Sequence, residues 1–389
     1  MVVGAKRPVL VVALAAMLLA TLSAGSCSPN GTAAPQQAPS DDVSYEDVPA
    51  TPGGSEDPHN RQNVVPVPKG TSPRGVEFAD SNTGYALFTS CVAGRPCQVG
   101  LVLTLDGGSS WVQRKLPFDD AIDVDMRLGR GNVLIIKAAP GGYFISRDTG
   151  RTFERRPLTP PPVELNLAEP QYSVGCLTAA NGCPEQPWII GDDGNRAPLP
   201  ARPPGDHRYT GLTSAADGTL WLTAQALVGT PSPAASSTVA VWSSADHGHT
   251  WRPQGTAHAT DETAVVRPVV APDGSDVWLV GPHFAARRQR GTTGSASVWT
   301  EATAMREVAE VFNAEVLPGG AVLIAGNQGV WVLDQQQRTR DTGARLIFRL
   351  RRLDAQTILG YPAQQSGEVW LCTTKNKACD WSHITVSAR

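Results

Sequence analysis

The chain has 389 residues, of which 33 are basic and 36 acidic, and its formal net charge is -3. Nucleic-acid phosphates require a clustered basic excess, which this chain lacks, so we expect no nucleic-acid partner. Gly (38) and Pro (32) are abundant and Trp (10) outnumbers Phe (8) and Tyr (6), a mixture typical of many short strands joined by turns.

Residues 1–27 are typical of an export signal. Lys6 and Arg7 precede an apolar run at 8–20 that is too short to span a bilayer comfortably, and small residues then lead to Cys27. The stretch AGSC at 24–27 resembles a bacterial lipobox, although Ala24 stands where that family prefers leucine. The resemblance implies a lipid on Cys27 and an anchor to the outer face of the cell membrane. Plain secretion after cleavage nearby is the alternative.

Residues 28–62 follow as a segment rich in Pro, Ala, Ser and acidic side chains, with Tyr45 as its one aromatic residue. Such a segment cannot bury enough apolar surface to fold, so we predict a disordered tether. A folded domain is predicted over 63–389.

Six of the seven cysteines fall into close pairs, which are Cys91 with Cys97, Cys176 with Cys183, and Cys372 with Cys379. Cys27 is the one left over. Disulfides persist outside the cytosol, so three disulfides across hairpins agree with export. A thiol-ligated metal would need CxxC spacing and nearby histidines, and neither occurs, so we expect no metal.

A short motif recurs within the predicted domain. TLDGGSSW (104–111), SRDTGRTF (146–153) and SADHGHTW (244–251) share the pattern Ser/Thr-x-Asp-x-Gly-x-Ser/Thr-aromatic. Decayed copies with Asp192 and Gly194, with Asp334, and with Asn376 continue the period. Trp111 and Trp381 are 270 residues apart, or six steps of 45, which predicts seven units.

This octet resembles the Asp-box, or BNR repeat, of sialidase-type propellers, here in a bacterial lipoprotein of actinobacterial type. The resemblance implies an all-β fold, a seven-bladed β-propeller with four-stranded blades. We place the blades at 72–118, 119–160, 161–204, 205–257, 258–309, 310–342 and 343–389, and we expect 63–69 to add a strand that closes the ring against the last blade.

In that family the box is a hairpin between the third and fourth strands on the outer rim, and we expect a structural role for its residues. The Asp accepts hydrogen bonds from its own turn, the Gly takes a positive φ, and the aromatic residue packs under the blade. The residues in these roles are Asp106, Gly108, Trp111, Asp148, Gly150, Phe153, Asp246, Gly248 and Trp251.

Sialidases of the family share an arginine triad, a Tyr nucleophile backed by Glu, an Asp acid/base and an RIP motif. No RIP motif occurs in this chain, and spacing ties neither Tyr209 nor Tyr361 to a Glu. We therefore predict no catalytic residues and no cofactor.

Arginines fall on or beside five of the seven predicted innermost strands, and we treat them as candidate anion-binding residues. They are Arg74, Arg127, Arg208, Arg267, and Arg349 or Arg351. A ring of guanidinium groups could hold a carboxylate or phosphate at one end of the central channel. The alternative is neutralisation by acids on the same strands, namely Glu77, Asp123, Asp125, Glu164 and Glu315.

Two long hairpins, at 226–238 and 282–297, could contact a partner, since binding residues concentrate on loops. The second carries Phe284, Arg287, Arg288 and Arg290. A tolerated surface insertion is the alternative.

The sequence thus predicts a monomeric, lipid-anchored, non-catalytic propeller that binds an envelope protein or a glycan through one face, with the lipid as its only membrane contact. An exo-acting glycosidase on acidic sugars is the alternative, because fold does not fix function.

Overall fold

The structure is a computed structural model. It describes residues 59–119, 121–177, 185–226, 237–259, 265–288, 298–302, 305, 308, 310–345, 347–363, 366–375 and 378–389. All of them belong to one compact unit, Asp47–Arg389. The export signal with Cys27, residues 28–58 of the predicted tether, Cys183 and Arg290 lie outside the described residues. Within that described part, no helix has the length and apolar character needed to cross a membrane.

Seven β-sheets follow one another along the described chain. The first sheet contains β2 (Ser72–Phe78), β3 (Gly84–Ser90), β4 (Gln98–Thr104) and β5 (Val112–Arg114), and the second contains β6 (Asp123–Leu128), β7 (Leu134–Ala139), β8 (Gly142–Ser146) and β9 (Glu154–Arg156). The third contains β10 (Tyr172–Gly175), β11 (Gln186–Ile190) and β12 (Arg196–Pro198), and the fourth contains β13 (His207–Ser214), β14 (Leu220–Ala226), β15 (Ser237–Ser244) and β16 (Arg252–Ala259).

The fifth sheet contains β17 (Arg267–Val270), β18 (Val277–Gly281), β19 (Phe284–Arg288) and β20 (Trp299–Glu301), and the sixth contains β21 (Val311–Val316), β22 (Val322–Gly326), β23 (Gly329–Leu333) and β24 (Thr339–Asp341). The seventh contains β25 (Ile347–Arg352), β26 (Thr357–Pro362), β27 (Glu368–Lys375), β28 (Ala378–Ala388) and, from the start of the domain, β1 (Asn60–Val65).

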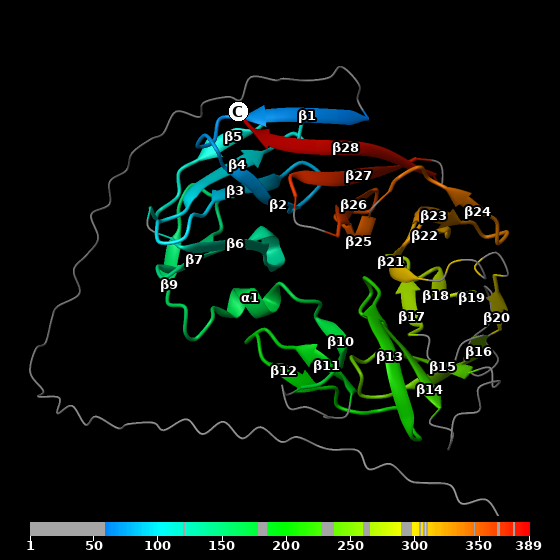
Figure 1. Cartoon of the computed structure of the whole chain (residues 1–389). Coiled ribbons are helices and arrows are strands. Elements are labelled where there is room, and N and C mark those ends of the chain that lie inside the picture. The colour runs from blue at the N-terminus through cyan, green and yellow to red at the C-terminus, as the bar shows by residue number, and fades with distance from the viewer. Residues whose placement is uncertain are drawn as a thin grey trace, which may run out of the picture. The chain divides into compact units, whose positions relative to one another are not determined.

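The sheets surround a common centre, with the first strand of each sheet innermost, apart from β1, which lies at the outer edge of the seventh sheet and leaves β25 innermost there (Figure 1). Inner strands of successive sheets touch, as β13 touches β17, β17 touches β21 and β21 touches β25. Neighbouring strands within a sheet are antiparallel, except where β1 joins the seventh sheet. Small antiparallel sheets set radially around a channel make a β-propeller.

The third sheet departs from the prediction of four strands, because three strands form it among the described residues. The one-turn helix α1 (Val163–Leu167) precedes it. Pro160, Pro161 and Pro162 lead into that helix, and proline cannot donate to a strand ladder. Glu164, predicted on an inner strand, therefore lies in α1. A second short element, the 3-10 helix Arg130–Asn132, lies in the turn between β6 and β7.

β1 closes the ring by pairing in parallel with β28, from Asn60 opposite His383 to Val65 opposite Ala388. The strand begins at Asn60, within the segment 28–62 that composition assigned to the tether. Two side chains of β1 also reach the first sheet. Arg61 donates from Nη1 to the carbonyl oxygen of Gly107 at 3.0 Å, and Asn63 donates from Nδ2 to that of Gly108 at 3.1 Å. β1 thus joins the last sheet to the first.

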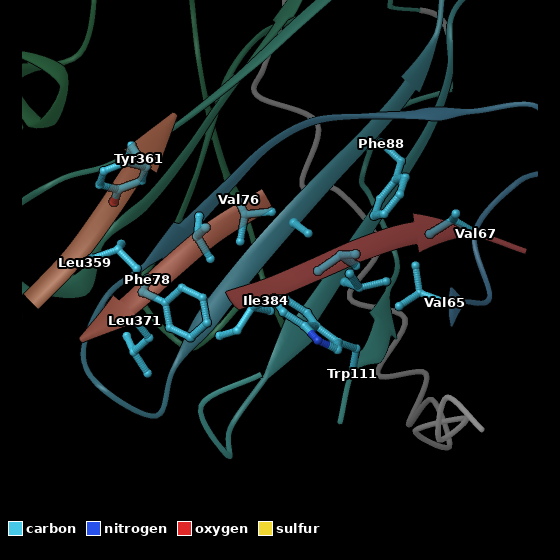
Figure 2. Packing of buried hydrophobic residues seen from close by; sticks show 14 residues of the cluster. Val65, Val67, Val76, Phe78, Phe88, Trp111, Leu359, Tyr361, Leu371 and Ile384 are labelled. Carbon is cyan, nitrogen blue, oxygen red and sulfur yellow. The ribbon is translucent and has the colours of Figure 1, made fainter. Parts of the chain in front are cut away.

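Apolar packing lies beneath this seam. Figure 2 shows Phe78 and Trp111 of the first sheet beside Ile384 of β28, in a cluster whose members are buried. The Phe78 and Trp111 rings meet edge to face with centroids 6.2 Å apart. Burying one large apolar side chain contributes about 1.5–3 kcal/mol, so such clusters between sheets dominate the stability of the ring.

Tryptophan N–H groups tie neighbouring sheets together. Trp251 donates to the carbonyl oxygen of Ala201 at 3.0 Å, and Trp299 to that of Gln254 at 2.7 Å. Trp278 donates to the carbonyl oxygen of Gly320 at 3.1 Å. A large apolar ring with one polar end suits such a position, which accounts for part of the high Trp count.

Candidate functional site

The Asp106 hairpin shows how the octet holds its turn. Asp106 Oδ1 accepts hydrogen bonds from the backbone N–H groups of Ser109 and Ser110 at 3.0 and 2.8 Å, and the Ser110 hydroxyl donates to Oδ2 at 2.6 Å. The Thr104 hydroxyl donates to Oδ1 and accepts from the N–H of Gly108. Asp148 has the same network, and Asp246 has it except that the N–H three residues on donates to its backbone carbonyl instead of its carboxylate. These carboxylates are occupied by their own turns and offer little to a ligand.

The other octet residues position the hairpin against the preceding sheet. Gly108, Gly150 and Gly248 have φ of +86°, +76° and +87°, which favours glycine. A Cβ on Gly108 would lie 3.0 Å from Ile384 of the seventh sheet, so the turn approaches its neighbour closely. Trp111 is 1% exposed, whereas Phe153 and Trp251 are half-buried.

The third octet carries two histidines that take part in its turn and in packing. His247 has a φ of 55°, and its Nδ1 lies 3.3 Å from the Tyr172 hydroxyl. The N–H of His249 donates to the carbonyl oxygen of Asp246. Among the described residues, no cluster of three or more His, Cys, Asp or Glu side chains could hold a metal ion.

The decayed copies differ in how their turns are held. In the third sheet Asp193, rather than the predicted Asp192, accepts from the N–H of Asn195 at 3.0 Å. Asp334 accepts from the N–H groups of Gln336 and Arg338, both at 2.9 Å. Asn376 of the last copy lies outside the described residues.

Disulfides join Cys91 to Cys97 and Cys372 to Cys379. The first lies in the connection between β3 and β4, and the second links β27 to β28. Cys176 is also disulfide-bonded, and its predicted partner Cys183 lies outside the described residues.

Strand register places the inner-strand side chains on two levels of the channel. In the six sheets other than the third, the inner-strand residue that pairs one position before the end of the ladder belongs to what we call the lower level. This level contains Glu77, Arg127, Thr213, Val269, Glu315 and Arg351. The residue two pairs earlier in the same ladder belongs to what we call the upper level. This level contains Gly75, Asp125, Gly211, Arg267, Asn313 and Arg349. Alternation along a strand sends both levels to the same face.

Acids neutralise most of the arginines of these levels. Glu77 of β2 lies 3.1 Å from Arg349 and 3.6 Å from Arg351, both on β25 of the seventh sheet. Arg127 lies 3.4 Å from Asp125 on its own strand. The neutralisation that the sequence left as an alternative therefore holds for these three arginines.

The remaining acids pair elsewhere. Glu315 contacts Arg352, Asp123 contacts Lys137, and Glu164 contacts Arg147. The candidate arginines Arg74, Arg208 and Arg267 form no ion pair within the part of the chain that the structure describes, and all three are exposed.

The candidate arginines do not all line one common space. Arg74, Arg127 and Arg349 line a cavity of about 330 Å³ between the first, second and seventh sheets, together with Glu77 and Tyr361. We call this space the arginine cavity. Its walls also include apolar side chains and Glu368, which lies 3.6 Å from His383. Arg208 lies outside the linings of the two cavities along the channel.

A tyrosine and a glutamate meet in the arginine cavity. The Tyr361 hydroxyl donates to Glu77 Oε2 at 2.5 Å, and the Arg349 guanidinium lies 4.0 Å from the centre of the Tyr361 ring. Burial, and then the charge of Glu77, raise the pKa of Tyr361 well above its ordinary value. The phenol therefore stays protonated as a hydrogen-bond donor. Sequence spacing missed this pair because 284 residues separate its members.

Bulges shape the start of four inner strands. The ladder is irregular at Arg74, Thr210, Phe312 and Phe348. Phe312 and Phe348 stack with centroids 4.5 Å apart and ring planes 20° from parallel. Bulges redirect side chains and are common beside binding sites.

A larger cavity of about 1130 Å³ lies along the inner strands of the third to sixth sheets. We call it the channel cavity. Arg267, Phe312, Asn313 and Glu315 line it, with Arg352 at its edge. Phe348 lines the arginine cavity instead, so the stacked pair lies where the two cavities meet.

The described residues of the predicted partner-binding hairpin at 282–297 make contacts within the fold. Phe284 is 4% exposed and belongs to the core between the fourth and fifth sheets. Arg287 lies 2.5 Å from Asp276, and Arg288 lies with its guanidinium 4.6 Å from the Trp221 ring. These three side chains were predicted to meet a partner. Phe284 and Arg287 thus already have contacts within the fold, and a contact of this hairpin with a partner stays a prediction.

No family model matches the sequence, and no curated protein matches it. Solved structures that resemble it include YCF48 from Cyanidioschyzon merolae, at 13% identity and a TM-score of 0.41 over 79% of this chain and 96% of that one. Virginiamycin B lyase from Staphylococcus aureus is 13% identical, with a TM-score of 0.37 over 78% of this chain and 96% of that one. The GH74 enzyme of Niastella koreensis is 12% identical, with a TM-score of 0.34 over 82% of this chain and 48% of that one. The propeller assignment rests on the sheet topology described above.

Proposed function

We propose that this chain is an exported, lipid-anchored, seven-bladed Asp-box propeller of the bacterial cell envelope. It has no catalytic activity and binds an anionic group of a partner protein or glycan at the arginine cavity. The observation that carries the proposal is Arg74, which lines this cavity, is exposed, and has no ion pair among the described residues.

The surroundings of Arg74 support this role. Arg127 and Arg349 are balanced by Asp125 and Glu77, so Arg74 is the cation of the cavity that still lacks an anion. A guanidinium binds a carboxylate through two parallel hydrogen bonds. Leu87 and Met126 add apolar wall, which strengthens such a contact by excluding water.

Binding can be tested by capture from envelope extract. The full chain with Cys27→Ser, which removes the predicted lipid site, would be compared with the same chain carrying Arg74→Ala or Arg208→Ala. Arg208 is the matched control, since it is an exposed inner-strand arginine outside both cavities. We expect the partner to be lost with Arg74→Ala alone. Equal recovery with all three chains would refute the arginine cavity as the site.

The anchor is tested separately. The proposal predicts incorporation of a palmitate analogue into the wild-type chain and none into Cys27→Ser, which should appear in the medium. Secretion of both chains without label would show that Cys27 is not lipidated, and would leave the binding site to be judged by its own experiment.

An exo-glycosidase is the second candidate, and the hydrogen bond between Tyr361 and Glu77 favours it. Tyrosine nucleophiles backed by glutamate occur in sialidases. Against it, Glu77 already holds Arg349 and Arg351, so these arginines are not available to grip a substrate carboxylate. We expect no hydrolysis of fluorogenic sialosides. Turnover that disappears in Tyr361→Phe would establish the enzyme instead.

A further inference from the structure

The stacked Phe312 and Phe348 rings lie where the arginine cavity meets the channel cavity. Phe348 lines the first cavity and Phe312 the second, and both rings are only partly buried. Each occupies a bulge at the start of its inner strand. The pair therefore presents an apolar surface between two polar compartments.

Arg267 in the channel cavity is comparable with Arg74 in the arginine cavity. It lines the cavity, is exposed, and has no ion pair among the described residues. The acid of that cavity, Glu315, is taken by Arg352 at 3.4 Å. Each compartment thus holds one arginine whose charge is not matched, with the phenylalanine pair between them.

The walls of the channel cavity suit a peptide better than a sugar. Val174, Val269, Pro268 and Val280 supply an aliphatic lining. Asn313 lies there as well, and its Oδ1 accepts no hydrogen bond within the described part of the chain. It is a spare acceptor for a donor such as a peptide N–H. Aromatic and arginine side chains around a desolvated centre are also the usual hot spots of protein recognition.

We propose that the two cavities are subsites of one site, and that its occupant is an acidic peptide segment of a partner protein. One acidic side chain pairs with Arg74, a second pairs with Arg267, and an apolar side chain between them packs on Phe312 and Phe348. This inference rests on the proposed binding at the arginine cavity. It adds the second arginine and the peptide nature of the ligand.

The pattern of such a peptide follows from extended backbone geometry. Alternate residues of a strand point to one side, so an extended peptide with acids at positions 1 and 5 and an apolar residue at position 3 presents all three side chains on one face. Two acids four residues apart span roughly 13 Å. Because both acids belong to one molecule, the second contact forms at high effective concentration, and the diacidic peptide binds more tightly than either monoacidic one.

The test uses the full chain with Cys27→Ser and a fluorescein-labelled Asp-Ser-Leu-Ser-Asp peptide, with binding followed by anisotropy. Comparison peptides replace either Asp with Asn, or Leu with Ser. Protein variants are Arg74→Ala, Arg267→Ala and the control Arg208→Ala. All three arginines are exposed, so equal thermal unfolding of the variants verifies the fold.

We expect Arg74→Ala and Arg267→Ala each to weaken binding on the order of tenfold or more, as loss of a charged hydrogen-bond pair does. Each should also abolish the advantage of the diacidic peptide, while Arg208→Ala changes nothing. An effect of Arg74→Ala alone would overturn the second subsite and leave the proposed function intact. No effect of either change would overturn both. Tighter binding of an acidic oligosaccharide, such as trigalacturonate, than of the peptide would overturn the peptide class.

Discussion

Tyr361 of β26 donates a hydrogen bond to Glu77 of β2 at 2.5 Å, across the seam where the last sheet meets the first. Arg349 and Arg351 of β25 approach the same carboxylate. The seam is therefore held by a polar cluster at the channel as well as by the apolar cluster around Trp111 (Figure 2). A contact of this kind serves stability whether or not a ligand is present.

Tyr361→Phe should lower the free energy of unfolding by about 1.5–3 kcal/mol, because the partly buried Glu77 carboxylate loses a hydrogen-bond donor. Urea unfolding of the Cys27→Ser chain measures this loss. Tyr143→Phe is the matched control, since Tyr143 is also buried and its hydroxyl has no hydrogen bond among the described residues. Equal losses in the two variants would contradict a special role for the Glu77 contact.

We expect the turn of the third octet, which Asp246 holds, to be sensitive to acid. The side-chain and backbone hydrogen bonds from Thr250, joined by that from Ser244, hold the pKa of Asp246 well below its ordinary value. A depressed pKa in the folded state means that the stabilisation is complete above the unfolded pKa of about 3.9 and is lost as pH falls toward the folded pKa. Asp246→Asn should therefore lower the melting temperature at pH 7.

The difference in melting temperature between Asp246→Asn and the parent chain should narrow as the pH is lowered below about 4, because the unfolded parent then binds a proton that its folded form, with the lowered pKa of Asp246, does not. Melting curves at pH 7 and pH 3 test this. Asp192→Asn serves as the comparison, since exposed Asp192 forms no hydrogen bond among the described residues. A gap for Asp246→Asn that stays constant across this range would show that the charge of the carboxylate does not matter to the turn.

Sequence spacing predicted the number of sheets because each octet ends one supersecondary unit, and the distance between aromatic residues such as Trp111 and Trp381 counts those units. It could not predict the third sheet, where Pro160–Pro162 exclude a regular ladder and α1 forms instead. The start of β1 at Asn60 was also missed. Arg61 and Asn63 belong to that strand because of partners in the first sheet, which local composition does not reveal.

The inner-strand arginines were found from the sequence because strand alternation directs every second side chain to the channel. The sequence also offered Asp125 and Glu77 as neutralising acids, but it could not assign Glu77 to its arginines, because these belong to another sheet. Glu77 of β2 meets Arg349 of β25 only after the ring closes. Arg287 was expected to contact a partner, and the sequence did not reveal that Asp276, which precedes β18 of the same sheet, lies beside it.

The hydrogen bond from Asn63 to Gly108 should contribute to the stability of the closed ring. Its amide donates to the Gly108 carbonyl from a side chain that is 9% exposed, so Asn63→Ala leaves that buried carbonyl without its partner. We expect a loss of about 1–2 kcal/mol in urea unfolding. Gln62→Ala is the control on the same strand, with an exposed side chain. Comparable destabilisation by both changes would assign the effect to the strand and not to the contact.

Two buried tryptophans with different N–H environments separate packing from hydrogen bonding. Trp111 and Trp278 are 1% and 0% exposed. Trp278 Nε1 donates to the Gly320 carbonyl at 3.1 Å, whereas Trp111 Nε1 has no partner among the described residues. Replacing either ring by phenylalanine removes a similar volume, but only Trp278→Phe also breaks a hydrogen bond between sheets.

Trp278→Phe should therefore destabilise the chain by about 1–3 kcal/mol more than Trp111→Phe, the penalty for an unsatisfied buried group. Trp111→Phe itself removes an unsatisfied N–H, which offsets part of its lost packing. Trp111→Ala serves as the reference for complete loss of a ring, because truncating a buried aromatic side chain lowers the free energy of unfolding by about 3–5 kcal/mol. The measurement is urea unfolding of the three variants in the Cys27→Ser chain. An equal cost for the two phenylalanine variants would mean that packing alone, and not the indole hydrogen bond, connects the fifth and sixth sheets.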